Sequence, residues 1–275
     1  MVVDMHSHLR GWSPDAVQTI EELLSAAEDK RLNGIAVTDH YDLDNVSDSG
    51  TKWIFDPKQY YETHLPFRKA PSLLSRAGVL IGVEISYLPN HIEEINRLAV
   101  MEEFDTVILS VHEYDHIDPV IDCKNFFQDG LSAAYGRIIH AIAESAMAVP
   151  AADIIGHYDF FSRYAPTKRS KMLYSHAPDE FDRLFRIMIQ NHQALEINTG
   201  TVDVLHTRKG YSLRESMPDE TLIARYRELG GCLFTLGSDA HCKEDVARCF
   251  TPVLEWLKGL GIDQCAWMEK RKWHL

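Results

Sequence analysis

Histidine and carboxylate residues recur at the ends of short apolar runs along this chain. Residues 2–4 lead into His6 and His8, and residues 233–237 lead into Asp239 and His241. Five further runs end in the same way, at His40, Glu84, His112, His157 and the pair Glu196 and Asn198. Imidazole nitrogens and carboxylate oxygens are common ligands of zinc, manganese and iron ions. The pattern therefore predicts a hydrolase with several metal ions.

The spacing of the candidate ligands supports this interpretation. His6 and His8 are two residues apart, and so are Asp239 and His241, so on a strand each pair points to one side. An isolated HxH pattern would be weak support, but here it accompanies several other run ends of the same kind. Glu84 ends a run that reads as buried, where a carboxylate is costly unless it is paired or bound to metal. Its two oxygens could bridge two ions.

The segments between these runs have the periodicity of helices with one apolar face. Their ranges are 14–31, 91–100, 131–147, 180–191, 219–229 and 243–257. The runs themselves are continuously apolar, as in parallel strands that are covered on both faces. Strand and helix therefore alternate seven times. We predict an α/β barrel with its active site at the C-terminal ends of the strands.

The size of the chain fits one such barrel. The sequence has 275 residues, 45% of them hydrophobic, and a barrel of this kind typically takes about 250 residues as one domain. We therefore predict that residues 1–275 form a single domain. Three stretches interrupt the alternation, at residues 42–59, 158–177 and 200–217. Each follows a ligand-bearing strand end, where insertions shape substrate pockets.

Charge and composition exclude some classes of partner. The net charge is −13, from 28 Lys and Arg against 41 Asp and Glu, so we expect no nucleic-acid partner. No apolar run approaches the roughly 20 residues of a membrane span, and no signal peptide is visible. The five cysteines form no CxxC pair, which is typical of free thiols in a reducing compartment. We expect a cytoplasmic protein with a small substrate and no membrane partner, and the sequence does not indicate its oligomeric state.

Taken together, the run ends resemble the motifs of the polymerase and histidinol phosphatase (PHP) superfamily along nearly the whole chain. These motifs are DMHSH at residues 4–8, TDH at 38–40, GVE at 82–84, SVH at 110–112, IGHYD at 155–159, LEINT at 195–199 and GSDAH at 237–241. The SVH, GHYD and EINT motifs, with Arg163 and Tyr164, look most like stand-alone histidinol-phosphate phosphatases. The resemblance implies a distorted (β/α)7 barrel that holds three divalent ions. The ligand types suit zinc, manganese or iron alike.

The same resemblance implies which residues hold each ion. One ion would bind His6, His8, Glu84 and Asp239. A second ion would share Glu84 and add His112 and His157. The third would bind His40, His241 and a residue soon after the first motif. The family places a His or Asp five or six residues beyond the second His, whereas here the nearest acid is Asp15, seven residues beyond His8. We take Asp15 as this ligand.

The resemblance also implies a reaction, the hydrolysis of L-histidinol phosphate to L-histidinol and phosphate in histidine biosynthesis. A water that bridges two ions beside Glu84 would become the nucleophile, and a metal-bound water or Asp239 would protonate the leaving alkoxide. Arg163 follows the fifth strand and resembles the arginine that binds the substrate phosphate in the family. A guanidinium fork suits phosphate. Glu84, Asp239 and Arg163 would thus be catalytic. Further substrate contacts would come from Arg208, His116 and Asn198.

Three alternatives stay open at this point. The first is a PHP-superfamily phosphoesterase that acts on nucleotides, DNA ends or another small phosphate ester, and the acidic charge argues against DNA. The second is a non-catalytic module with the PHP fold, which would not need so complete a ligand set. The third is a mononuclear amidohydrolase, which also begins with HxH on a strand. That class usually has a lysine at a strand end, and no lysine stands at such a position here.

Overall fold

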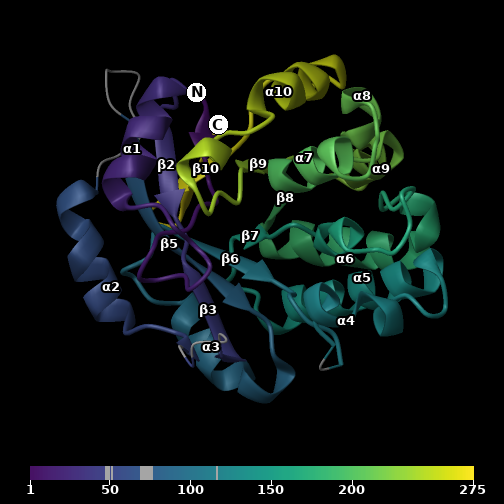
Figure 1. The fold of residues 1–275 in the computed structure, drawn as a ribbon, viewed down its shortest axis with the longest axis horizontal. Helices are drawn as coiled ribbons and strands as arrows, with labels where there is room; N and C mark the ends of the chain where they lie inside the picture. The colour runs from purple at the N-terminus through teal and green to yellow at the C-terminus, as the bar shows by residue number, and fades with distance from the viewer. Residues whose placement is uncertain (47–49, 51, 69–76, 116) are drawn as a thin grey trace.

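A mostly parallel nine-stranded sheet forms the centre of the computed structural model (Figure 1), which describes residues 1–46, 50, 52–68, 77–115 and 117–275. Its strands are β1 (Val3–Asp4), β2 (Gly34–Val37), β3 (His40–Val46), β4 (Lys52–Trp53), β5 (Gly78–Ser86), β6 (Thr106–Ser110), β7 (Ile154–Ile155), β8 (Ala194–Asn198) and β9 (Phe234–Gly237). They follow the order β1-β2-β5-β6-β7-β8-β9. Neighbours along this path run parallel, as predicted from their continuous apolar sequences.

The two edges of this sheet meet, so the strands form a nearly closed barrel. Past the end of β1, the Met5 amide donates to the Leu236 carbonyl at 2.8 Å, and the Asp239 amide donates to the His6 carbonyl at 2.9 Å. Both β2 and β3 pair with β5, so they act as two halves of one barrel strand. The predicted α/β barrel is therefore confirmed. β3 continues into an antiparallel arm with β4, within the first predicted insertion.

Helices surround the strands (Figure 1). Their bounds are α1 (Ile20–Asp29), α2 (Pro57–His64), α3 (Ile92–Ala99), α4 (Pro119–Phe126), α5 (Leu131–Ala148), α6 (Pro178–Asn191), α7 (Thr199–Thr207), α8 (Leu213–Ser216), α9 (Glu220–Glu228) and α10 (Phe250–Gly259). Short 3-10 turns are η1 (Leu65–Phe67), η2 (Pro89–His91), η3 (Phe160–Arg163), η4 (Tyr174–His176) and η5 (Lys243–Asp245). Within the described ranges, no helix is both long enough and apolar enough to span a bilayer.

Local capping explains where the predicted helix boundaries were wrong. The first helix starts at Ile20 rather than residue 14. Thr19 and Glu22 form a capping box, which fixes the N-terminal end of the helix at this position. The last begins at Phe250 rather than residue 243, after Cys249 in the left-handed region at φ 57°. The predicted interruption at residues 200–217 contains α8 and most of α7. Asn198 caps α7 by accepting a hydrogen bond from the Thr201 amide at 3.2 Å.

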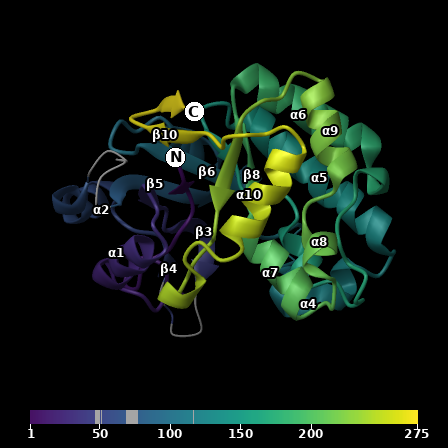
Figure 2. The same cartoon turned by 90° about the horizontal axis from the view of Figure 1, so that it is seen from above.

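A C-terminal hairpin closes the end of the barrel opposite the ligand-bearing strand ends. It consists of β10 (Trp267–Glu269) and β11 (Lys272–His274), paired antiparallel, and Figure 2 shows β10 beside the N-terminus. Trp267 and Met268 pack with the buried barrel interior, made of Val3, Met5, Ala36, Leu80, Ile108, Ile154 and Ala194. The hairpin therefore completes an apolar cluster that the strands alone would leave open to solvent.

Replacing Trp267 by alanine is expected to lower the free energy of unfolding by about 3–5 kcal/mol, the usual cost of removing a large buried aromatic side chain. Trp267 is 7% exposed and stacks on His274 with ring centroids 4.2 Å apart. Denaturant unfolding measures the loss. The control is Met147→Ala on α5, where 51% of the residue is exposed. A loss below about 1 kcal/mol for the tryptophan variant would argue against this role.

Candidate metal centre and substrate cavity

Glu84 lies at the centre of the predicted ligands, at the C-terminal half of β5, with each carboxylate oxygen facing different imidazoles. Oε2 lies 2.9 Å from His40 Nδ1 and 3.3 Å from His6 Nε2. Oε1 lies 2.8 Å from His157 Nε2 and 3.2 Å from His112 Nε2. β5 runs between β2/β3 and β6, which explains why its carboxylate can reach both sides. Such a carboxylate has the geometry to bridge two cations.

Asp239 joins His6 and His8 in a second arrangement of ligand atoms. Its Oδ1 lies 3.3 Å from His8 Nε2 and 3.8 Å from His6 Nε2. The three side chains are buried and their ligand atoms lie within 4.8 Å of one another. Asp239 has φ 54°, in the left-handed region that non-glycine residues rarely adopt. Backbone strain of this kind concentrates at functional sites.

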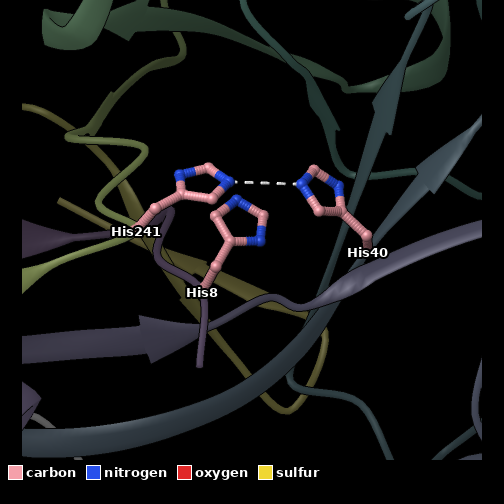
Figure 3. A group of neighbouring side chains, drawn as sticks. All are labelled: His8, His40 and His241. Atoms are coloured by element: carbon pink, nitrogen blue, oxygen red, sulfur yellow. Dashed lines mark hydrogen bonds between the residues drawn. The ribbon is translucent and has the colours of Figure 1, made fainter. Parts of the chain in front are cut away.

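A third group brings together His8, His40 and His241 (Figure 3). The Nε2 atoms of His40 and His241 are 3.3 Å apart, and the His8 ring stacks at 4.2 Å against each of the other two rings. Asp15, the ligand predicted in spite of its unusual spacing, extends to the same place. Its Oδ2 lies 3.1 Å from His241 Nε2, and its Oδ1 lies 3.7 Å from His40 Nε2.

The charges of the site suit cation binding. Burial alone would raise the pKa of Glu84, but the imidazoles of His6, His112 and His40 hold it well below its usual value. Against the effect of burial, neighbouring imidazoles and a guanidinium also hold the pKa of Asp239 well below its usual value. Burial lowers the pKa of His8 strongly, which keeps this imidazole in the neutral form that binds metals. The centre thus offers ionised carboxylates beside a neutral imidazole.

Several buried ligand atoms lie close to one another but make no hydrogen bond of acceptable geometry, and this observation tests whether the residues fit metal ions. They are His6 Nε2, His8 Nε2, His40 Nδ1 and Glu84 Oε2. Buried polar atoms are nearly always satisfied, because leaving one without a partner is costly. All four lie among the clusters described above, where a divalent cation would satisfy them. The nitrogen and oxygen donors suit zinc, manganese or iron, so the residues present fit metal binding.

Further polar residues orient the imidazoles, and they were not assigned a role from the sequence. Asp42 Oδ2 lies 2.9 Å from His112 Nδ1, and Glu196 Oε1 lies 2.7 Å from His6 Nδ1. Contacts of this kind to the second ring nitrogen fix the orientation of ligand histidines. Asp42 is two residues after His40 on β3, so strand alternation could have identified it. The sequence pattern identified Glu196 at a strand end but assigned it no function. Ser13, whose Oγ lies 3.2 Å from His8 Nδ1, is part of no sequence pattern that would have identified it.

Arg163 reaches the centre from η3, just after β7. Its Nη1 and Nη2 donate to Asp239 Oδ2 at 3.1 and 3.0 Å, and its Nε donates to Thr201 Oγ1 at 2.9 Å. Nη2 also donates to Asn198 Oδ1 at 2.8 Å. Asn198, a predicted substrate contact, is only 3% exposed and instead holds this arginine. The guanidinium lies over the Phe160 ring, 5.1 Å from its centroid.

The ligand groups open into a cavity of about 830 Å³. Its wall includes six of the predicted metal ligands: Asp15, His40, His112, His157, Asp239 and His241. It also includes other polar, aromatic and apolar residues, among them Asp42, Trp53, Asp118, Val120, Ile121, Phe160, Arg163, Tyr164 and Arg248. A cavity of this size holds a small organic molecule.

Two predicted substrate contacts have a different outcome. Arg208 is exposed and does not belong to the described lining of the cavity. Because α7 begins directly after β8, it carries Arg208 roughly 13 Å along its axis, and the role of Arg208 as a substrate contact stays a prediction that this lining does not support. Arg248 lines the cavity instead, with its Nε donating to the Ser238 carbonyl at 3.1 Å and its Nη2 to the Asp239 carbonyl at 3.2 Å. His116, the other predicted contact, lies outside the described residues.

Comparison with known proteins agrees with this architecture. The model of the family described as "PHP domain" matches residues 4–200, more than half of the chain. A protein from Clostridium acetobutylicum named "Probable histidinol-phosphatase" is 28% identical over 98% of this chain and 98% of its own length. The "Histidinol-phosphatase" of Lactococcus lactis is 24% identical over 87% of this chain and 84% of its own length.

A solved structure shares the fold across the whole length. The crystal structure of histidinol phosphate phosphatase from Lactococcus lactis, complexed with zinc, L-histidinol and phosphate, has a TM-score of 0.77 to this chain. The match covers 100% of this chain and 99% of the other, at 22% sequence identity. At this identity the likeness establishes the barrel and its connectivity.

Proposed function

The chain belongs to the PHP domain family, and we propose that it is a metal-dependent phosphomonoesterase that hydrolyses L-histidinol phosphate to L-histidinol and phosphate. The observation that carries this proposal is the Glu84 carboxylate, whose two oxygens face two different sets of imidazoles. The substrate is suggested by relatives named for histidinol phosphate hydrolysis that match nearly end to end. The reaction would be a step of histidine biosynthesis.

We propose three divalent ions of zinc, manganese or iron as cofactors. The proposed ligands are His6, His8, Asp15, His40, Glu84, His112, His157, Asp239 and His241. When bound, such ions lower the pKa of water and neutralise charge on phosphoryl oxygens. Glu84 would bind two of the ions. Asp42 would hold the ring of His112 in the orientation needed for metal binding, and Glu196 would do the same for His6.

Side chains around the proposed ions suggest which residues bind the phosphate group and which could protonate the leaving alkoxide. The guanidinium of Arg163 would donate the N–H of Nη1 that its contacts to Asp239, Asn198 and Thr201 leave free to a phosphate oxygen, as a charge-assisted hydrogen bond. Asp239 is disfavoured as the donor of a proton to the leaving alkoxide, because its pKa is held well below its usual value and a general acid must be protonated near neutral pH. Its proposed role is therefore to bind metal and hold Arg163. A non-catalytic role is disfavoured by the unsatisfied ligand atoms.

Replacing Arg163 by alanine is expected to raise KM for the phosphate ester about tenfold to a hundredfold, the value of a lost charge-assisted hydrogen bond. The effect on kcat should be smaller, because the residue is not itself a proposed metal ligand. Steady-state kinetics with quantified metal separates the two constants. Arg214→Ala on α8 is the matched control, since this arginine is exposed and does not belong to the described lining of the cavity. An unchanged KM in the Arg163 variant would reject its phosphate role.

The proposed activity is tested by measuring phosphate release from L-histidinol phosphate by the purified protein, with its metals quantified. Parallel assays contain a nucleoside monophosphate and single-stranded DNA. We expect efficient release from L-histidinol phosphate alone. Preferential release from the nucleotide would favour the alternative of a nucleotide phosphoesterase. No release from any ester by fully metallated protein would overturn the proposed function.

A further inference from the structure

Asp118 differs from the other carboxylates that line the cavity. Asp15, Asp42 and Asp239 each lie beside an imidazole of the metal centre, at 3.1, 2.9 and 3.3 Å respectively. In the part of the chain that the structure describes, Asp118 has no such imidazole contact. Its Oδ1 instead caps α4 by accepting a hydrogen bond from the Val120 amide at 2.7 Å. Its other oxygen is therefore available to a molecule in the cavity.

Aromatic residues of the cavity that Asp118 lines suit an organic cation. Trp53 and Tyr164 belong to its wall, and aromatic faces attract cations. Burial raises the pKa of Tyr164, and Asp118 is among the charges that add to this effect against Arg163. Tyr164 therefore stays a neutral phenol, and it adds no negative charge of its own to this part of the wall.

The apolar part of the wall comes from the helix that Asp118 caps. Val120 and Ile121 at the start of α4 also line the cavity, and they are 55% and 84% exposed. These side chains offer carbon surface beside a free carboxylate oxygen. The positive groups of the cavity, Arg163 and Arg248, both contact Asp239. An ester with its phosphate near Asp239 would therefore find separate apolar and anionic surface at Asp118 for its alcohol part.

We propose that Asp118 binds the positively charged group of the alcohol part of the substrate and thereby makes the enzyme selective for cationic phosphate esters. This inference rests on the proposed phosphomonoesterase function and adds to it a residue that determines specificity. In L-histidinol phosphate, the ammonium group is the cation that Asp118 would bind. The carboxylate acts in substrate binding, so its charge should matter little for esters whose alcohol part is neutral.

The test compares L-histidinol phosphate with phenyl phosphate, whose alcohol part is neutral, in wild-type protein and in Asp118→Asn. Asparagine caps helices as well as aspartate does, so the variant keeps the start of α4 and removes only the charge. We expect the ratio of kcat/KM for L-histidinol phosphate to that for phenyl phosphate to fall about tenfold to a hundredfold. Asp118→Ser, which also preserves a cap, should lower the ratio to the same extent.

The matched control is Asp122→Asn on the same helix. Asp122 accepts a hydrogen bond from the Asn125 amide at 3.3 Å and is not part of the described cavity wall, so its charge change should leave the ratio within twofold. A ratio that stays within twofold in Asp118→Asn, or falls equally in the control, would overturn the inference. Hydrolysis of phenyl phosphate by the wild-type protein tests the proposed phosphomonoesterase activity, independently of any selectivity that Asp118 provides.

Product inhibition gives a second measurement, which would not change if Asp118 only stabilised the start of α4. L-histidinol carries the cation without the phosphate, and inorganic phosphate carries the anion alone. In Asp118→Asn, the inhibition constant of L-histidinol against phenyl phosphate hydrolysis should rise about tenfold or more, while that of inorganic phosphate should not change. Parallel rises of both constants would contradict a role in cation binding.

Discussion

Replacing Glu84 by glutamine is expected to lower kcat by roughly a hundredfold to a thousandfold, the scale of losing a central electrostatic group in an active site. Glutamine has nearly the same shape, so the barrel should fold. It carries no charge, however, and one carboxylate oxygen becomes an amide nitrogen that cannot bind a cation. Because the two oxygens of Glu84 face different imidazoles, the substitution should also lower the bound metal. Turnover and metal content are measured on the same preparation.

The control for this prediction is Glu62→Gln on α2, where 64% of the side chain is exposed. It removes one negative charge from the surface and should leave both quantities unchanged. Circular dichroism verifies that each variant is folded. If Glu84→Gln retained full metal and near wild-type kcat, the central role of this carboxylate would be wrong.

Removing the bound ions with a chelator is expected to abolish activity and to lower the midpoint of thermal unfolding by about 5–10 °C. A ligand present at a hundred times its dissociation constant stabilises the folded state by about 2.7 kcal/mol, and each kcal/mol shifts the midpoint by about 2–4 °C in a protein of this size class. The physical cause is the set of buried nitrogens and oxygens without hydrogen-bond partners. Differential scanning calorimetry measures the shift.

Readdition of zinc, manganese or iron should restore both the midpoint and the activity, and the most effective ion would indicate the native metal. The Glu84→Gln variant provides the comparison, because its midpoint should respond less to the chelator. A midpoint that is identical before and after complete removal of metal would show that the ions do not contribute to folding stability.

The hairpin at the other end of the barrel explains how so polar a centre is supported. Met5 packs into the buried apolar cluster of the barrel interior, and His6, the next residue along the chain, belongs to the metal centre. Trp267 and Met268 fill the same cluster from the C-terminal hairpin. The rigid apolar layer thus lies directly beneath the ligands. Loss of Trp267 should lower stability first and affect metal binding as a consequence.

Local sequence pattern was sufficient to predict the barrel and its candidate ligands. Continuous apolar runs indicated parallel strands, and the residues at their ends, such as Glu84 and His157, were expected to meet because all C-terminal ends of parallel barrel strands face one side. The two-residue spacing of His6 and His8 determines that both imidazoles point the same way. The prediction of Asp15 comes from the resemblance to the PHP superfamily and not from this pattern, and Asp15 lies beside His40 and His241.

Tertiary structure alone decided which remaining side chains serve the cavity. Arg208 was predicted and Arg248 was not, because the course of α7 and the position of the segment after β9 are set by packing between distant parts of the chain. Asn198 was expected at the substrate, yet its carbonyl oxygen is occupied by Arg163 and the cap of α7. Asp118 gave no signal in the sequence, because its importance depends on which neighbours leave its second oxygen free. Strand ends can be read from one segment at a time, whereas hydrogen-bond partners are determined by distances between segments far apart in the chain.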